Sequence, residues 1–224
     1  MCGIAGIQFK RDVPREGDTA RLDQAAAHFA ESLHHRGPDH VGLHRTPRAV
    51  FANLRLAIVD RAGGQQPIHG QGVHARRGIV YNGEVYNHEA LRPGLEGTHA
   101  FRTQSDTEVV LATVLAHGPA GLALLDGMFG LCVWDDADAS FLLARDRFGM
   151  KPLYVYEDDE CIAFASELRT LLGLPGLDHG LDPVGFQDYL AYRYNLAPHT
   201  QFARIEKLPA GCLARWKDGP RPMA

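Results

Sequence analysis

Cysteine is scarce in this sequence and is never clustered. The four cysteines stand far apart, and no two of them form a Cys-x-x-Cys pair. Zinc sites and disulfide frameworks need short, regular cysteine spacings, so we expect neither a disulfide framework nor a metal site. Cys132 and Cys161 lie in apolar runs, where a free cysteine behaves as a small buried hydrophobic side chain. A reducing compartment, the cytoplasm, is the expected location.

Basic runs and long apolar runs are missing as well. No block of five or more lysines and arginines occurs, and the net charge is −4 at pH 7, so a nucleic-acid partner is not expected. The first thirty residues lack the basic segment and apolar core of a signal peptide. No apolar stretch is expected to reach the ~18–20 residues that span a bilayer, so we predict no membrane partner.

The remaining composition is that of a globular protein, with 45% hydrophobic and 22% charged residues among 224. Strand-like runs follow one another more often than they alternate with helical patterns, which favours an antiparallel α+β fold over a doubly wound sheet. Apolar periodicity predicts helices at about 19–35, 106–117 and 182–191, and strands at about 2–9, 41–44, 49–54, 77–81, 128–134, 141–144, 153–156 and 161–165.

The pattern loosens from about residue 173, where glycine, proline and histidine become frequent. We therefore predict a main domain over residues 2–172. Residues 173–224 are then either the C-terminal part of the same domain or a linker.

Cys2 is the cysteine with a distinctive position. It follows Met1 and opens the apolar segment Gly3–Ile7. A small second residue generally permits removal of Met1, which would leave Cys2 with a free α-amine as well as a thiol. A chain-terminal amine titrates near neutral pH and can take the proton of an adjacent thiol. Cys2 is thus a candidate nucleophile that carries its own base.

Three polar clusters interrupt the apolar pattern, and each also has a purely structural interpretation. Arg36–Asp39 is compatible with a helix stop and a turn, and Asn82–Glu84 with a hairpin turn, because Asn-Gly is a strong hairpin signal. In the third cluster Ser105 is a candidate N-cap and Glu108 would complete a capping box.

Chemistry at Cys2 offers a second interpretation of the same clusters. Attack on an amide needs donors for an oxyanion, and the Asn82 side chain beside the Gly83 N–H supplies two. If the substrate is a free amino acid, Arg55 suits its carboxylate, and Glu84 or Asp106 suits its ammonium.

Seven ordered runs make the chain resemble the glutaminase domain of glutamine-hydrolysing asparagine synthetases, which are class II amidotransferases with an N-terminal cysteine. The resemblance covers residues 2 to about 167, and the run Ile205–Gly211 is similar to the closing strand of the family. The seven runs are Met1–Gly6, Arg36–Asp39, Arg55–Asp60, Tyr81–Asn87, Ser105–Glu108, Asp126–Gly130 and Arg145–Tyr154.

The resemblance implies an N-terminal nucleophile hydrolase-like fold, a four-layer αββα sandwich with two antiparallel sheets. It also implies that Cys2 attacks the side-chain amide of L-glutamine and forms a thioester, which water cleaves to give glutamate and ammonia. The implied roles are an oxyanion hole at Asn82 and Gly83, a carboxylate clamp at Arg55, an ammonium clamp at Glu84 and Asp106, and pocket-lining backbone at Ile58 and Val59.

The Ser-Gly-Gly-x-Asp-Ser loop, with which the synthetase domain of this family holds pyrophosphate, does not occur here. We therefore expect no cofactor in this chain, since ATP and magnesium would belong to an ATP-dependent synthetase domain or subunit. The chain is then a fragment, or a separate subunit that passes ammonia to such a partner, and a homodimer is left open. Two other interpretations stay open: a catalytically silent assembly module, and the glutaminase domain of another class II amidotransferase.

Overall fold

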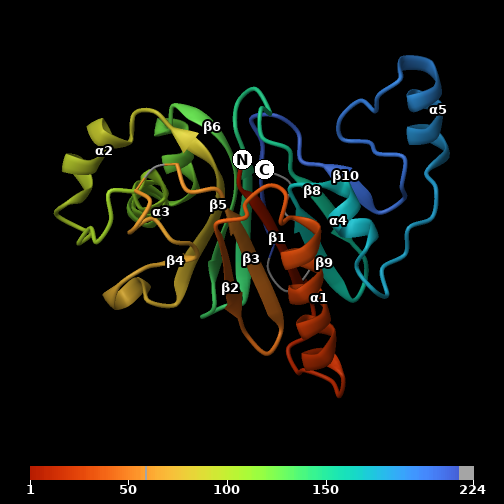
Figure 1. Ribbon diagram of the computed structural model, residues 1–224, viewed down its shortest axis with the longest axis horizontal. Coiled ribbons are helices and arrows are strands. Elements are labelled where there is room, and N and C mark those ends of the chain that lie inside the picture. Colours follow the sequence, from red (N-terminus) through yellow and green to blue (C-terminus); the bar gives the residue numbers. More distant parts are fainter. Residues whose placement is uncertain (59, 217–224) are drawn as a thin grey trace.

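The computed structural model describes residues 1–58 and 60–216, and they form two antiparallel sheets between layers of helices (Figure 1). The six-stranded sheet has the order β10-β8-β9-β1-β3-β2, and the five-stranded sheet has the order β11-β7-β6-β5-β4. The strands are β1 Gly3–Phe9, β2 His40–Arg45, β3 Ala49–Arg55, β4 Ile68–His69, β5 Arg77–Val85, β6 Gly127–Asp135, β7 Ser140–Arg145, β8 Tyr154–Glu157, β9 Cys161–Ala165, β10 Ile205–Lys207 and β11 Leu213–Trp216.

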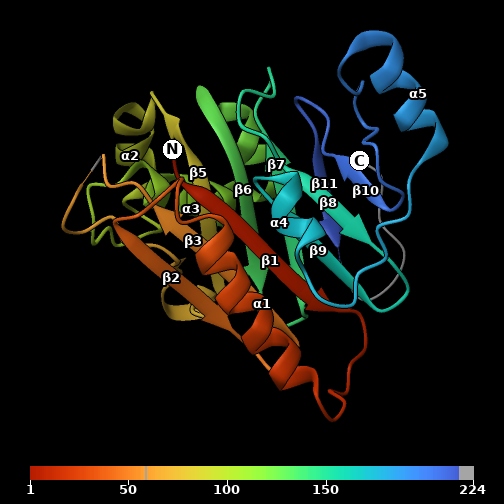
Figure 2. The ribbon, with the colours of Figure 1, turned by 45° about the vertical axis from the view of Figure 1, so that its right-hand side comes forward.

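Helices cover the outer face of each sheet. Figure 1 shows α2 and α3 beyond one sheet, and α1 and α4 beyond the other. In Figure 2, α1 lies along β1, while α5 stands at the margin of the molecule. The helices are α1 Asp18–Ser32, α2 His88–Leu95, α3 Asp106–His117, α4 Leu168–Leu172 and α5 Pro183–Tyr192, with 3₁₀ turns η1 Gly72–His74 and η2 Gly118–Leu124.

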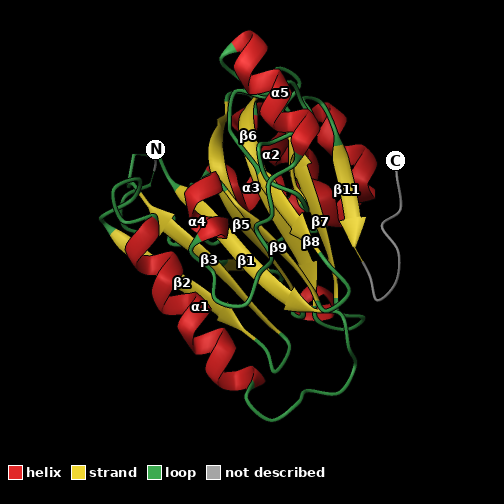
Figure 3. Cartoon of the chain, turned by 90° about the vertical axis from the view of Figure 1, so that its right-hand side faces the viewer, coloured by secondary structure: helices red, strands yellow, loops and turns green. Residues whose placement is uncertain are grey.

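Three apolar clusters account for the layers. Phe29 of α1 and Leu171 of α4 pack against the outer face of the six-stranded sheet. Val110 and Leu111 of α3 pack against the outer face of the five-stranded sheet. Large aromatic side chains fill the space between the sheets, where burial of apolar area contributes most to stability; they include Phe51, Trp134, Phe141, Phe164 and Trp216. The predicted αββα sandwich is confirmed, and Figure 3 shows its strands and the helices around them.

The segment beyond residue 173 adds one edge strand to each sheet. β10 pairs with β8 in the six-stranded sheet, and β11 pairs with β7 in the other. The predicted division between residues 172 and 173 stays a prediction, although the strands on its far side complete both sheets.

Two structural alternatives from the sequence are corrected. Asn82 and Gly83 do not form a hairpin turn, because β5 continues through them and they pair with Gly130 and Phe129 of β6. Ser105 is the N-cap of α3 and accepts from the Thr107 N–H, as predicted. The capping box is wrong, because Glu108 binds the N–H groups of residues 102 and 103 instead.

The expectation about apolar length is also corrected. Among the described residues, Asp106–Leu124 is one stretch of 19 residues that is long and apolar enough to cross a membrane. The sequence pattern predicts a helix over about 106–117, and η2 follows α3 there without a gap. Half of this stretch is buried inside the fold, and its α3 side chains belong to the core that covers the five-stranded sheet.

Candidate active site

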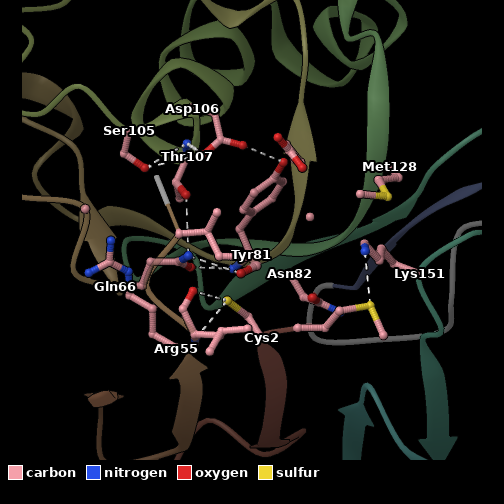
Figure 4. A pocket seen from close by; sticks show the side chains of 16 residues that line it. Cys2, Arg55, Gln66, Tyr81, Asn82, Ser105, Asp106, Thr107, Met128 and Lys151 are labelled. Carbon is pink, nitrogen blue, oxygen red and sulfur yellow. Dashed lines mark hydrogen bonds between the residues drawn. The ribbon is translucent and has the colours of Figure 1, made fainter. Parts of the chain in front are cut away.

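A cavity of about 120 Å³ opens where β1 begins. β1 and β3 of one sheet and β5 and β6 of the other end or begin around it, together with the first turn of α3. Figure 4 shows side chains from these elements around the pocket, with Cys2 between Arg55 on one side and Lys151 on the other. Cys2, Arg55, Ile58, Asn82, Gly83, Glu84 and Asp106 all line the cavity.

Cys2 is half-buried and is held against the end of β3. Its Sγ accepts from the Leu56 N–H at 3.4 Å and lies 3.6 Å from the Leu56 carbonyl oxygen. The Arg36 Nε–H donates to the Cys2 carbonyl at 3.0 Å. These contacts fix the thiol across the cavity from β5.

Asn82 is buried at the centre of the cavity wall. Its side-chain Nδ2 has no hydrogen-bond partner within residues 1–58 and 60–216. An unpaired buried amide is costly, and most such groups in native proteins are satisfied. A donor left open in a cavity next to a thiol is chemically available for an oxyanion.

The Gly83 N–H points to the edge of β5 that faces away from β6. Along an antiparallel strand, alternate N–H groups face the same edge. Tyr81 N donates to Gln66 Oε1 at 2.7 Å, and Val85 N donates to Asp106 Oδ2 at 3.1 Å, both on the edge away from β6. The N–H of Gly83 lies between these two.

Two observations concern position 83. The partners of the opposing residue fit an N–H directed away from β6, and the space around Cα requires a glycine. The opposing residue, Phe129, accepts at its carbonyl from the Asp146 N–H at 2.9 Å and donates its own N–H to the Asp146 side-chain Oδ2 at 3.2 Å. A Cβ on Gly83 would lie 2.3 Å from the Met128 carbonyl oxygen. A side chain at position 83 would therefore push β6 away from β5.

Asp106 lies in the first turn of α3, where a carboxylate is favoured by the helix dipole. Its Oδ2 accepts from the Tyr81 hydroxyl at 2.9 Å and from the Val85 N–H, and its Oδ1 accepts from the Thr107 N–H at 2.8 Å. Burial raises the pKa of Tyr81 well above its usual range, and the Asp106 charge adds to the shift. The phenol therefore stays protonated and keeps donating to Asp106.

Arg55 is buried at the end of β3 and faces the loop that follows it. Its guanidinium donates to the Asp60 carbonyl at 2.6 Å and to the Arg61 carbonyl at 3.1 Å. Hydrogen bonds from the Gln104 and Gly63 N–H groups lower the pKa of the Asp60 carboxyl. Asp60 thus ties the loop to the segment before α3.

Three predicted site residues remain, and they differ in their position relative to the cavity. Glu84 shares a face of β5 with Asn82 and lines the cavity. Ile58 lines it too, with 71% of its surface exposed. Val59 lies outside the described residues. The structure thus brings seven of the eight predicted residues to one cavity, and their individual roles stay predictions.

Sequence reasoning missed Gln66, which lines the cavity. Its side-chain amide accepts from Tyr81 N and donates to the Tyr81 carbonyl at 3.1 Å, so it pairs with β5 as a neighbouring strand would. No local pattern marks a glutamine in a loop for this contact.

Lys151 belongs to the run Arg145–Tyr154, and it is buried and lines the cavity. Arg145 and Asp146 organise its loop. Asp146 accepts from the N–H groups of Phe148, Met150 and Lys151 at 2.9–3.1 Å. Arg145 donates to the carbonyls of Gly149 and Lys151.

No group of three or more His, Cys, Asp or Glu side chains in the described part of the chain could hold a metal ion.

The fold and the cavity define a class of protein. Two stacked antiparallel sheets between helices, with a thiol at the start of the first strand, are the arrangement of N-terminal nucleophile amidotransferases. Residues 1–223 match the family model of the glutamine amidotransferase domain, and the chain belongs to this family.

Curated relatives and a solved structure agree with this assignment. The chain is 33% identical over 212 residues to the glutamine-hydrolyzing asparagine synthetase 1 of Bacillus subtilis (strain 168), covering 94% of this chain and 33% of that relative. It is 44% identical over 172 residues to asparagine synthetase 3 of Arabidopsis thaliana, covering 76% and 28%. The chain therefore spans about a third of the length of the curated relatives it matches.

The solved structure is glutamine phosphoribosylpyrophosphate amidotransferase from Bacillus subtilis. The likeness has a TM-score of 0.68 at 16% identity and covers 100% of this chain and 49% of that one. At that identity the likeness shows the fold.

Proposed function

We propose that this chain hydrolyses L-glutamine to L-glutamate and ammonia through a thioester on Cys2. The observation that carries the proposal is the pair of donors on β5. The unpaired Asn82 Nδ2 and the Gly83 N–H face the cavity that also contains the Cys2 thiol. Donors placed in advance where negative charge develops are the largest single contribution to many acyl-transfer reactions.

In the proposed reaction Met1 is absent, so Cys2 has a free α-amine. The amine takes the thiol proton, and the sulfur attacks the side-chain carbonyl carbon of glutamine. Asn82 and Gly83 stabilise the oxyanion of the tetrahedral intermediate. The amine then returns the proton to the nitrogen as ammonia leaves and the carbonyl re-forms as a thioester. Attack by water, with the amine again accepting a proton, releases glutamate and restores the thiol.

The same cavity offers a clamp for the amino-acid end of glutamine. Arg55 matches an α-carboxylate, because a guanidinium presents a planar fork of donors. The loop carbonyls of Asp60 and Arg61 fix the plane of that fork. Glu84 and Asp106 match an α-ammonium, and Asp106 is already oriented by Tyr81 and Val85. Together they favour a free amino acid over a peptide.

The ammonia is proposed to pass to an ATP-dependent synthetase domain or subunit that amidates aspartate or a related carboxylate. The names of the curated relatives support this, since they are called glutamine-hydrolyzing asparagine synthetases and are about three times as long as the part matched here. ATP and magnesium would then be bound by that partner. A cytoplasmic location is part of the same proposal, and a homodimer stays a prediction.

The test is glutamate formation from glutamine by the purified, Met1-processed chain and by its Cys2→Ala variant. We expect turnover in the unmodified protein and none above background in Cys2→Ala. Cys212→Ala is the matched control, because Cys212 is an exposed free cysteine outside the cavity. Intact mass verifies that Met1 has been removed. Unchanged turnover in Cys2→Ala would contradict the mechanism.

A further inference from the structure

Lys151 is a buried cation in the cavity that the proposed reaction does not use. With Met1 in place, only 5% of its surface is exposed. Its Nζ lies 3.3 Å from the Met1 sulfur, and the described residues contain no carboxylate within ion-pairing distance of it. A buried ammonium without an anionic partner is costly, so its retention calls for an explanation.

The position of Lys151 relates it to the chain terminus. Met1 is bonded directly to Cys2, so standard bond lengths place Nζ within roughly 10 Å of the Cys2 nitrogen. In the view of Figure 4, Lys151 and Met128 lie on one side of Cys2, and Arg55 and Gln66 lie on the other. Lys151 is therefore on the side away from the proposed carboxylate clamp.

A count of the charges that face Cys2 separates Lys151 from the others. Arg36, which contacts the Cys2 carbonyl, pairs with Glu167 at 2.9 Å. In the clamp, Arg55 matches the carboxylate of a bound amino acid, and Glu84 and Asp106 together face its single ammonium, so one negative charge is left over. Tyr81 is neutral, as its raised pKa requires. That remaining charge balances Lys151, which is the one counted cation that neither pairs with a carboxylate in the described residues nor belongs to the clamp; the groups counted are Arg36 with Glu167, Arg55 from β3, Tyr81 and Glu84 from β5, Asp106 from α3, and Lys151.

We propose that Lys151 is a positioning residue for proton transfer, whose ammonium keeps the Cys2 α-amine unprotonated and favours the thiolate. This inference rests on the proposed function, because it assigns the amine as the base. A positive charge disfavours a second positive charge nearby and stabilises a negative one, so both effects raise the reactive fraction of Cys2. At about 10 Å and an effective dielectric constant of about 20, the interaction changes that fraction by roughly 15-fold without salt, and by roughly threefold when ordinary salt screens it.

The experiment measures the pH dependence of Cys2 alkylation by iodoacetamide in Met1-processed protein with the Cys212→Ala background. Lys151→Met and Lys151→Gln remove the charge, whereas Lys151→Arg keeps it. Lys10→Met is the matched control, because Lys10 pairs with Glu157 at 2.9 Å and does not line the cavity. Alkylation needs no glutamine, so it reports on the thiol and amine alone.

We expect the midpoint of the alkylation curve to move to higher pH in Lys151→Met and Lys151→Gln, with a roughly three- to 15-fold slower rate below the midpoint, the larger factor at low salt. Lys151→Arg and Lys10→Met should follow the unmodified protein. In the unmodified protein, about 1 M salt should move the midpoint in the same direction, because salt screens the charge. This last measurement involves no variant that could misfold.

Superimposable curves for Lys151→Gln and the unmodified protein, or no salt effect, would overturn the proposal. A purely structural role for Lys151 would lower the urea midpoint without moving the alkylation midpoint, and this too would overturn it. The two proposals fail separately. Turnover retained in Cys2→Ala rejects the mechanism, whereas turnover lost in Cys2→Ala with unshifted alkylation curves rejects only the role of Lys151.

Discussion

Asn82 shows at the scale of one residue how the fold leaves a polar group open. Asn53 on β3 donates its Nδ2 to the Tyr81 carbonyl at 3.0 Å, while its Oδ1 stays unpaired among the described residues. Asn82, the residue after Tyr81 on β5, has no partner for its Nδ2 among the same residues. The difference is that Asn82 borders a cavity where a substrate atom can complete the hydrogen bond.

The Asn82→Ala variant tests this interpretation. Removal of one oxyanion donor should lower kcat by ~10²–10³-fold and leave KM for glutamine nearly unchanged, because the donor acts on the transition state. Steady-state kinetics with glutamine provide the measurement. The variant should be no less stable than the unmodified protein, since it loses an unpaired buried group. A variant with raised KM and unchanged kcat would show that Asn82 binds ground-state glutamine instead.

Among the elements, the start of α3 depends on one buried carboxylate. Glu108 accepts from Arg102 N, Thr103 N, the Thr103 hydroxyl and the His99 ring at 2.7–3.1 Å. Burial alone would raise the pKa of the Glu108 carboxyl, but the hydrogen bonds from Thr103, His99 and Arg102 outweigh it and lower the pKa. This carboxylate shapes the loop whose Gln104 N–H holds Asp60.

Glu108→Gln should lower the free energy of unfolding by about 1–3 kcal/mol at pH 7, because an amide donor replaces one acceptor. A lowered pKa in the folded state gives stability above the unfolded value of about 4.3, and that stability is lost as the pH falls through the folded pKa. The difference in unfolding free energy between Glu108→Gln and the unmodified protein should therefore narrow from pH 7 towards pH 3. Urea unfolding across this range checks the prediction, with exposed Glu89→Gln as the control. A constant difference would show that the charge of Glu108 is irrelevant.

The elements also show what a single sequence can predict. The apolar patterns predict α1, α3, α5 and eight strands, β1–β3 and β5–β9, within a few residues, whereas β4 and β11 are missed. β4 and α4 are too short to show a period, and α2 contains Pro93 and Gly94, which usually break helices. The predicted site residues belong to recognisable motifs. Gln66 has no motif, and Lys151 could not be linked to Cys2 by local sequence, because 149 positions separate them and only the folded chain brings them together.

At the scale of the whole molecule, the short strands β10 and β11 matter for stability, because large apolar side chains in and beside them lie in the core. Trp216 of β11 is fully buried between the sheets and stacks on Phe141 with 5.5 Å between ring centroids. Leu208, just after β10, is buried in the same cluster. Both follow residue 172, where the sequence predicts that the main domain ends.

A chain that ends at residue 172 should therefore fail to fold, whereas a chain that ends at Trp216 should unfold cooperatively. Loss of the buried Trp216 side chain alone, in Trp216→Ala, should cost ~3–5 kcal/mol of unfolding free energy. Circular dichroism and urea unfolding of the two truncations and the variant test this. Cooperative unfolding of residues 1–172 would show that the predicted boundary is a true domain end.

The side-chain partners of β5 have a consequence for self-association. A strand with open N–H and C=O groups on its free edge is a template for another chain, and proteins guard such edges. Beyond the two-residue β4, Gln66 occupies both backbone groups of Tyr81, and Asp106 occupies the N–H of Val85. An incoming strand would find the positions on either side of Gly83 already taken. This edge of β5 can thus leave the Gly83 N–H open for the reaction without offering a continuous row of open backbone groups to a strand of another chain.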